Sequence, residues 1–202
     1  MSMLGLDFLG PITPACSQTG ARYVLIAIDY FSRFTWAGAY KFCTMTEVCY
    51  LLTQHIAPVF GWPKAIYTDN GSHFTGQEIR SIFDTHGVTH FTAPVTHPSS
   101  VGLVERNVQL MMSQIRKRSI DSGLSSPPWA TFLTEATISI NTRLMRVHGY
   151  SPANILMGYT PRLWHQQTAT TTAVEEDEIK ALPANQISIR NALRSEQSEL
   201  AM

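Results

Sequence analysis

Short apolar runs separated by turn residues fill the first third of the chain. Three of them are rich in β-branched and aromatic residues: MLGLDFLG (3–10), RYVLIAIDYF (22–31) and FTWAGAYKF (34–42). Turn residues at Gly20 and at Ser32-Arg33 lie between them. The pattern predicts three strands that follow one another as an antiparallel meander.

The spacing of apolar residues then changes to that of a helix over 44–60. Thr44 and Glu47 have the spacing of a capping box at its start. Pro58 and the Gly61-Trp62-Pro63 segment predict its end.

Two short strands and a second helix follow. KAIYTD (64–69) and VTHFTA (88–93) have the length of buried strands. Between them, Thr75 and Glu78 again have capping-box spacing, and Gly87 ends the predicted helix.

Helices dominate the remainder of the pattern. Apolar residues at helical spacing predict helices over 101–122 and 129–146. Ser151 and Pro152 have the order of an N-cap and a first helical residue, and Gly158 closes this last short helix. Strands followed by alternating helices and strands predict an α/β domain with a mixed sheet.

Composition supports a folded domain. Of 202 residues, 44% are hydrophobic and 15% are charged, which is typical of globular proteins. No apolar run reaches the ~18 residues of a membrane-spanning helix, and the first residues lack the pattern of a secretory signal. The three cysteines are too few for a disulfide framework, so we expect free, buried thiols.

Charge is distributed unevenly, although the formal net charge is zero. Residues 1–174 hold 12 Lys and Arg against 9 Asp and Glu, a balance of +3, whereas residues 175–202 hold 3 against 6, a balance of −3. A Thr- and Ala-rich stretch and an acidic run follow Trp164. We therefore expect one domain over 1–164 and a poorly ordered linker or acidic tail over 165–202.

Three carboxylates, Asp7, Asp69 and Glu105, have positions at which they can converge. Asp7 lies in the first predicted strand, Asp69 ends the fourth, and Glu105 lies early in the long helix. Carboxylate oxygens are hard ligands suited to Mg²⁺ or Mn²⁺. The alternative is that Asp69 forms only an Asx-type turn and that Glu105 is a solvated helix residue. Spacing alone leaves both interpretations open.

The sequences around these carboxylates are more specific. GLDFLGPI, VLIAIDYFSRF, IYTDNGSHFT and THPSSVGLVERN occur in this order, and 35 residues lie between Asp69 and Glu105. Over about residues 4–162 the chain resembles the catalytic core of retroviral and long-terminal-repeat retrotransposon integrases, the D,D-35-E transferase group. The resemblance implies an RNase H-like fold of the α/β class, with a mixed five-stranded sheet flanked by helices.

The same resemblance implies a chemistry and its partners. Asp7, Asp69 and Glu105 would be catalytic residues that bind two Mg²⁺ or Mn²⁺ ions. The family trims the 3′ end of the element's DNA and joins the new 3′ hydroxyl to target DNA, as a polynucleotidyl transferase. It further implies a homo-oligomer acting on element ends and target duplex in the nucleus, without a membrane partner.

Six residues are candidates for binding DNA. By resemblance, the loop before the long helix and one face of that helix approach DNA, and Ser99 stands where the family often has a glutamine. An alternative for the Arg116–Arg118 run is a solvated helix end that complements the helix dipole. The candidates are His97, Ser99, Arg106, Gln109, Arg116 and Lys117.

Other residues have plainer explanations. Asp29 fits a turn or cap residue rather than a metal ligand, and His73, which follows the DNG turn, fits a structural or exposed histidine. We expect the four tryptophans to pack in the core or at its edge.

Two other functions stay open. A domesticated or decayed remnant that binds only nucleic acid or protein is favoured by the mild charge and by the few residues before Asp7. An RNase H-type nuclease shares the metal chemistry but would prefer an RNA–DNA hybrid. Binding of Mg²⁺ or Mn²⁺ would distinguish an enzyme from a remnant. A preference for an RNA–DNA hybrid over duplex DNA would indicate the nuclease.

Overall fold

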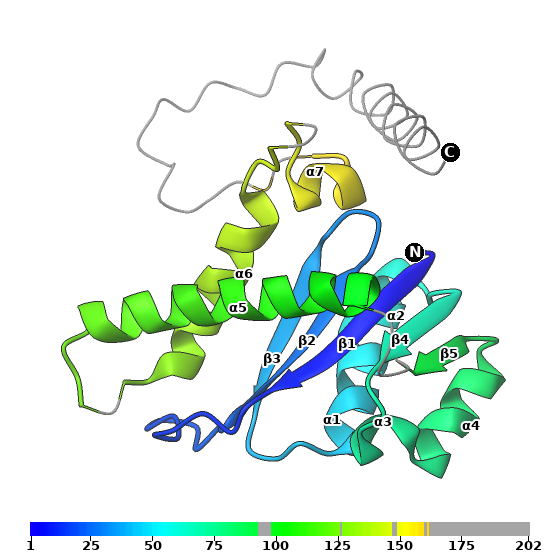
Figure 1. Ribbon diagram of the computed structural model, residues 1–202, viewed down its shortest axis with the longest axis horizontal. Coiled ribbons are helices and arrows are strands. Elements are labelled where there is room, and N and C mark those ends of the chain that lie inside the picture. Colours follow the sequence, from blue (N-terminus) through cyan, green and yellow to red (C-terminus); the bar gives the residue numbers. More distant parts are fainter. Residues whose placement is uncertain (93–97, 126, 147–148, 160, 162–202) are drawn as a thin grey trace. The chain divides into compact units, whose positions relative to one another are not determined.

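The structure is a computed structural model that describes residues 1–92, 98–125, 127–146, 149–159 and 161, with the side chains of 98–105 outside the description. The chain divides into two compact units, Met1–Ile140 and Asn141–Met202. The first unit contains the sheet and most helices (Figure 1). Each unit is described by itself.

A five-stranded mixed sheet forms the centre of the first unit, as the sequence predicts. Its strands are β1 (Met3–Leu9), β2 (Tyr23–Asp29), β3 (Thr35–Tyr40), β4 (Ala65–Thr68) and β5 (Thr89–Thr92). Their spatial order is β3-β2-β1-β4-β5. The first three strands pair antiparallel, whereas β4 pairs parallel with both β1 and β5. The predicted meander is therefore confirmed.

Helices cover both faces of the sheet. Those after β3 are α1 (Met45–Tyr50), the π-helix η1 (Leu51–Ile56), α2 (Ala57–Phe60), α3 (Ser72–Thr75) and α4 (Gln77–Thr85). Those after β5 are α5 (Pro98–Asp121), the 3₁₀ turn η2 (Trp129–Thr131) and α6 (Phe132–Thr142). Parallel strands need such crossover connections, which explains why helices flank β4 on both sides in the sequence.

The first core cluster fills one face of the sheet. Alternate residues Leu4 and Leu6 of β1 point to this face because side chains alternate along a strand. They pack with residues of α1, η1, α3 and α4, among them Leu52, Phe74 and Phe83. Burial of this apolar surface fixes which face of β1 is covered by these helices.

The second core cluster fills the opposite face, which α5 crosses (Figure 1). Ile26 and Ile28 of β2 pack there with Met111 and Ile115 of α5 and with Leu133 of α6. All five side chains are buried. The helical stripe predicted for the long helix is thus the face that packs on the sheet.

Several predicted boundaries were wrong. The helix over 44–60 is interrupted by η1, just before Pro58, which lacks the N–H that a regular helix needs there. Neither predicted capping box forms. The Thr44 hydroxyl donates to the Glu47 carboxylate rather than capping the backbone, and α4 begins after Gly76 rather than at Thr75.

Two other helix limits differ from expectation. The long helix begins at Pro98 instead of 101, because proline suits the first turn of a helix. The helix predicted to reach residue 146 ends at Thr142. The short helix α3, directly after the DNG turn, was not predicted.

The second unit contains α7 (Pro152–Met157). Ser151 caps it: its side chain accepts from the Asn154 N–H, and the Asn154 side chain accepts from the Ser151 N–H. Gly158 ends it in the left-handed conformation, with φ 83°. This predicted cap is confirmed.

Across the ranges that the structure covers, none of the helices combines the length and the apolar character needed to cross a bilayer. The predicted tail over 165–202 lies outside the described residues, as does Trp164.

Candidate metal centre and nucleic-acid interface

Asp7 lies in the central strand β1 on the face that α5 crosses. Its neighbours Leu6 and Phe8 belong to the first core cluster, so alternation directs Asp7 to the other face. Its partner on β2 is Ile26, which is buried in the second cluster. Asp7 itself is only partly buried, so its carboxylate retains contact with solvent.

Asp69 directly follows β4 and is exposed. Its Oδ1 accepts a 2.8 Å hydrogen bond from the Gly71 N–H, which makes the Asx turn expected of an Asp-Asn-Gly segment. Among the described residues this is the hydrogen bond that holds the Asp69 side chain, and it uses one of two carboxylate oxygens. The turn therefore constrains the Asp69 carboxylate through Oδ1.

The sheet register relates the positions of Asp7 and Asp69. β1 and β4 are parallel neighbours, and their last pair is Gly5 with Tyr67, one residue before β4 ends at Thr68. The same register, extended by two residues, would bring Asp7 opposite Asp69. Neighbouring strands lie about 5 Å apart, so we expect the two carboxylates to be close at this end of the two strands.

The thiol of Cys43 is an independent indication of this proximity. Burial raises the pKa of Cys43, and the negative charges of Asp69, Glu47 and Asp7 raise it further. Both aspartates therefore act on the same sulfur. The raised pKa keeps Cys43 a neutral thiol near neutral pH.

His73 lies beside the Asp69 turn. Its Nδ1 is 3.5 Å from the Cys43 Sγ, and its ring makes edge contacts with Phe8 and Phe74 at centroid distances of 4.9 and 4.3 Å. Burial lowers the pKa of His73, while the charge of Asp69 opposes this shift. The expectation of a structural histidine holds, but the structure places it next to a candidate ligand.

Glu105 is the eighth residue of α5, and its side chain lies outside the described residues. The helix contacts β1, the strand that carries Asp7. Among the side chains that the structure describes, no three His, Cys, Asp or Glu residues form a group able to hold a metal ion. Convergence of the third carboxylate therefore stays a prediction.

The donor chemistry fits a hard divalent cation. Two carboxylates side by side repel each other unless a cation lies between them. Both are accessible to solvent, and Mg²⁺ is usually bound by one or two carboxylates while it keeps several waters. Asp7 and Asp69 satisfy this requirement.

The DNA-binding candidates divide into two groups. Arg106, Gln109, Arg116 and Lys117 lie on α5 with exposed side chains. Ser99 lies in the first turn of α5 with its side chain outside the description, and His97 lies outside the described residues. The exposed group spans about three turns of one helix.

Asp29 is a turn residue, as expected. Its Oδ2 accepts from both the N–H and the hydroxyl of Ser32, at 2.8 and 2.6 Å. It is buried at the last position of β2, where it pairs with Leu4 of β1. Its place in a closed turn separates it from the carboxylate pair.

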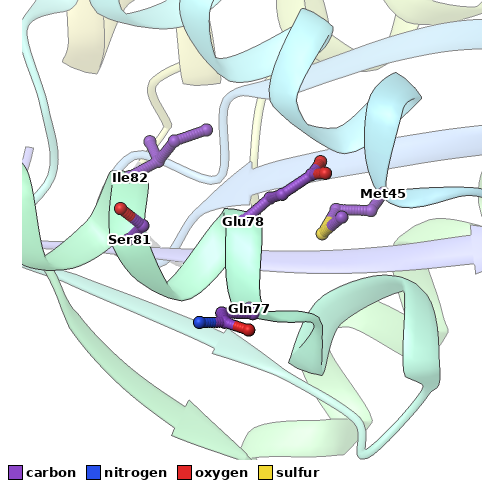
Figure 2. A pocket seen from close by; sticks show the side chains of 5 residues that line it. All are labelled: Met45, Gln77, Glu78, Ser81 and Ile82. Carbon is purple, nitrogen blue, oxygen red and sulfur yellow. The ribbon is translucent and has the colours of Figure 1, made fainter.

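A separate hollow of about 560 Å³ lies between α1 and α4 (Figure 2). Figure 2 shows Glu78 reaching from α4 toward Met45 of α1. Gln77, Ser81 and Ile82 complete its lining. None of these residues is a candidate ligand, so the hollow is distinct from the carboxylate pair.

Two features near the carboxylates were not predicted from the sequence: the contact of Cys43 with His73, and the close packing of the His73 ring. Cys43 precedes the first helix in an ordinary polar turn, and no sequence pattern links it to a histidine 30 residues later. The contact arises only because the segment after β3 and the turn after β4 meet at one edge of the folded sheet.

Several known proteins are similar to this chain. Residues 7–98 match the family model described as Integrase core domain. The chain is 30% identical over 142 residues to the Gag-Pol polyprotein of Woolly monkey sarcoma virus. This match covers 70% of the chain and 8% of that polyprotein. The matched segment thus spans only 8% to 14% of the length of curated relatives of this kind.

Two solved structures have a similar fold. One is the HTLV-2 integrase catalytic core domain in complex with magnesium, in a trimeric form. Its TM-score is 0.62 at 21% identity, and the match covers 77% of this chain and 95% of that chain. The other is a simian T-cell lymphotropic virus intasome in complex with PP2A regulatory subunit B56 gamma. Its TM-score is 0.66 at 22% identity, and the match covers 86% of this chain and 60% of that chain.

These structures confirm the RNase H-like fold. Together with the matching family model and the retroviral polyproteins, they confirm the resemblance drawn from the sequence and support a retroviral-type integrase catalytic core.

Proposed function

We propose that this chain is the catalytic core of a metal-dependent DNA strand-transfer enzyme that acts on the ends of retrotransposon DNA. The observation that supports it is the parallel register of β1 and β4, which pairs Gly5 with Tyr67 and, extended by two residues, would bring Asp7 opposite Asp69. The match to the integrase core domain supports integration chemistry in general, and by resemblance to integrases the reaction would be 3′-end processing followed by joining to target DNA.

Asp7 and Asp69 would hold the divalent ions, with Glu105 of α5 as the third carboxylate. Bound Mg²⁺ or Mn²⁺ ions, two of them in this reaction class, activate the attacking oxygen and stabilise the leaving oxygen. The Gly71 N–H fixes Oδ1 of Asp69, so the carboxylate is oriented before a cation arrives. Preorganisation of this kind reduces the reorganisation needed during the reaction.

Exposed side chains on α5 would contact DNA. Arg106, Arg116 and Lys117 offer positive charges to the phosphates, and Gln109 offers an amide. Ser99, in the first turn of the same helix, and His97, which lies outside the described residues, are proposed contacts from the family resemblance. Because the net charge is zero, we expect this chain alone to bind DNA weakly and with strong dependence on salt.

Assembly and location follow the family. We propose a homo-oligomer that joins element ends to a target duplex in the nucleus. Trimeric and intasome forms of the similar structures support assembly with further copies.

A strand-transfer assay tests this proposal. The 202-residue chain is incubated with labelled duplex DNA and Mn²⁺ or Mg²⁺, and trimmed and joined products are separated by size. Asp69→Asn should lower product formation by at least about 100-fold, because it removes a ligand of the ion that stabilises the transition state. Asp84→Asn, an exposed aspartate of α4, is the matched control and should retain activity.

Full activity of the Asp69→Asn variant would contradict the mechanism. A wild-type chain without product under either metal, and without metal binding, would instead favour the decayed remnant.

A further inference from the structure

A cysteine and a histidine from two separate segments meet beside the turn that carries Asp69. Cys43 lies between β3 and α1, and His73 lies in α3. The Cys43 Sγ is 3.5 Å from the His73 Nδ1, although the two residues are 30 positions apart in the sequence. We call these two side chains the Cys43–His73 pair. The proposed metal centre, which consists of carboxylates, uses neither of them.

The distance between the two ligand atoms has the value that a tetrahedral zinc ion requires. Zn²⁺ binds thiolate sulfur at about 2.3 Å and imidazole nitrogen at about 2.0 Å, and a tetrahedral angle between these bonds places the two atoms about 3.5 Å apart. The distance in the Cys43–His73 pair is 3.5 Å. The sulfur and the nitrogen are therefore spaced to share one such ion.

Neighbouring aromatic rings hold the histidine in this position. The His73 ring makes an edge contact with Phe8, at a centroid distance of 4.9 Å, and another with Phe74, at 4.3 Å. Phe74 is fully buried in the first core cluster. Because the core restricts the ring, less side-chain freedom is lost when Nδ1 binds an ion.

Both side chains of the pair can be reached from solvent. Cys43 and His73 are each partly exposed. Cys16, in contrast, is 2% exposed and packs in the second core cluster. A metal ion in solution therefore has access to the Cys43 sulfur and almost none to that of Cys16.

The charges around the pair attract a cation. Burial raises the pKa of Cys43, and the negative charges of three nearby carboxylates, those of Asp69, Glu47 and Asp7, raise it further. The same negative charges lower the energy of a positive ion next to the sulfur. When the ion binds, the metal–sulfur bond forms and the thiol proton leaves to solvent.

We propose that Cys43 and His73 bind one divalent cation of the zinc class, through Sγ and Nδ1, with water as the remaining ligands. Because the described side chains contain no metal-holding group of three His, Cys, Asp or Glu residues, the site has two protein ligands. Its sulfur distinguishes it from the carboxylate centre, since thiolate selects zinc and related ions whereas Mg²⁺ prefers oxygen.

An ion at this site would inhibit the proposed metal centre, a consequence that rests on the proposed function. A Cβ added at Gly71 would lie 2.5 Å from the His73 Cε1 and 2.9 Å from the Asp69 Oδ1, so the ring and the carboxylate are neighbours. A cation held by the pair would therefore repel Mn²⁺ or Mg²⁺ at Asp69.

Absorption of Cd²⁺ tests the site without catalysis, because cadmium bound to a thiolate has a charge-transfer band in the ultraviolet. Cd²⁺ is titrated into the 202-residue chain with excess Mg²⁺, which occupies oxygen ligands, and without thiol reductants. We expect a band that saturates at about one ion per chain and that Zn²⁺ removes by competition. Cys43→Ser should abolish the band, and His73→Asn should weaken Cd²⁺ binding at least about 10-fold.

Cys49→Ser is the matched control, because Cys49 is also a partly exposed thiol and lies in α1, close to Cys43 in the sequence. It should keep the band and the Kd of wild type. Asp69→Asn should keep the band as well, since the ligands are sulfur and nitrogen. Cys43→Ala is the second variant at the sulfur position, and thermal unfolding checks that each variant is folded.

A band that persists in both Cys43 variants, an equal loss in Cys49→Ser, or wild-type affinity in His73→Asn would overturn the inference. Absence of a band in wild type would overturn it too. Strand-transfer products without a band would contradict this inference alone, whereas a band without strand-transfer products would contradict the proposed function alone.

Discussion

Asp69 shows that two interpretations of one residue need not exclude each other. Its Oδ1 forms the Asx turn with Gly71, and its role as a metal ligand stays a prediction that this turn does not contradict. The DNG segment made the turn predictable. The packing of His73 and Cys43 around it was not predictable, because it depends on segments that meet only in the folded sheet.

Gly71 is the residue at which this arrangement is most sensitive. A Cβ there would lie 2.5 Å from the His73 Cε1 and 2.9 Å from the Asp69 Oδ1. Because the backbone of Gly71 is compatible with alanine, with φ −58°, Gly71→Ala should disturb the side chains more than the fold. We predict about 10-fold weaker Mn²⁺ binding by calorimetry, with a loss of stability of about 1 kcal/mol.

Removal of the histidine ring provides the control for this prediction. The double variant Gly71→Ala, His73→Ala relieves the closest contact and should regain part of the Mn²⁺ affinity. Equal Mn²⁺ affinity in Gly71→Ala and wild type would show that the turn does not position the carboxylate.

At the scale of elements, strand periodicity was a more reliable guide than helix caps. All five strands lie within the short apolar runs predicted to be strands. The capping boxes at Thr44 and Thr75 did not form, since a polar side chain at the right spacing has other partners, such as Glu47 for Thr44. The π-helix before Pro58 has no sequence pattern that distinguishes it from an α-helix.

The β4–β5 pair gives a prediction about pH. The His90 Nε2 lies 2.9 Å from the Thr68 Oγ1, next to Asp69, and burial, together with the positive charge of Arg80, lowers the pKa of His90 below 6.5. The unfolded chain therefore binds a proton at a higher pH than the folded chain does. Stability should fall as pH decreases through about 6.5.

Thermal unfolding between pH 8 and pH 5 measures this effect. His90→Gln should make the melting temperature less dependent on pH over that range, while some dependence remains because burial also lowers the pKa of His73. His55→Gln, at an exposed position of η1, should behave as wild type. An identical pH profile for His90→Gln and wild type would refute the prediction.

At the scale of the whole molecule, the local motifs indicated the resemblance to integrase cores, and the composition indicated a globular protein. The four motif segments carry the resemblance that the family model and the polyproteins confirm. The predicted division into a domain over 1–164 and a tail over 165–202 stays a prediction. The contact between the rings of Tyr30 and Tyr67 depends on strand order, which the sequence pattern does not specify beyond the meander.

The central claim is that Asp7 and Asp69, with Glu105, form a site for divalent cations. Isothermal titration of Mn²⁺ and Mg²⁺ into the 202-residue chain tests it most directly, with Asp84→Asn as the control for loss of an exposed negative charge. We predict saturable binding by wild type and by Asp84→Asn, and at least about 10-fold weaker binding by Asp7→Asn and by Asp69→Asn. Equal cation binding by all four proteins, or none by wild type at millimolar metal, would contradict the account.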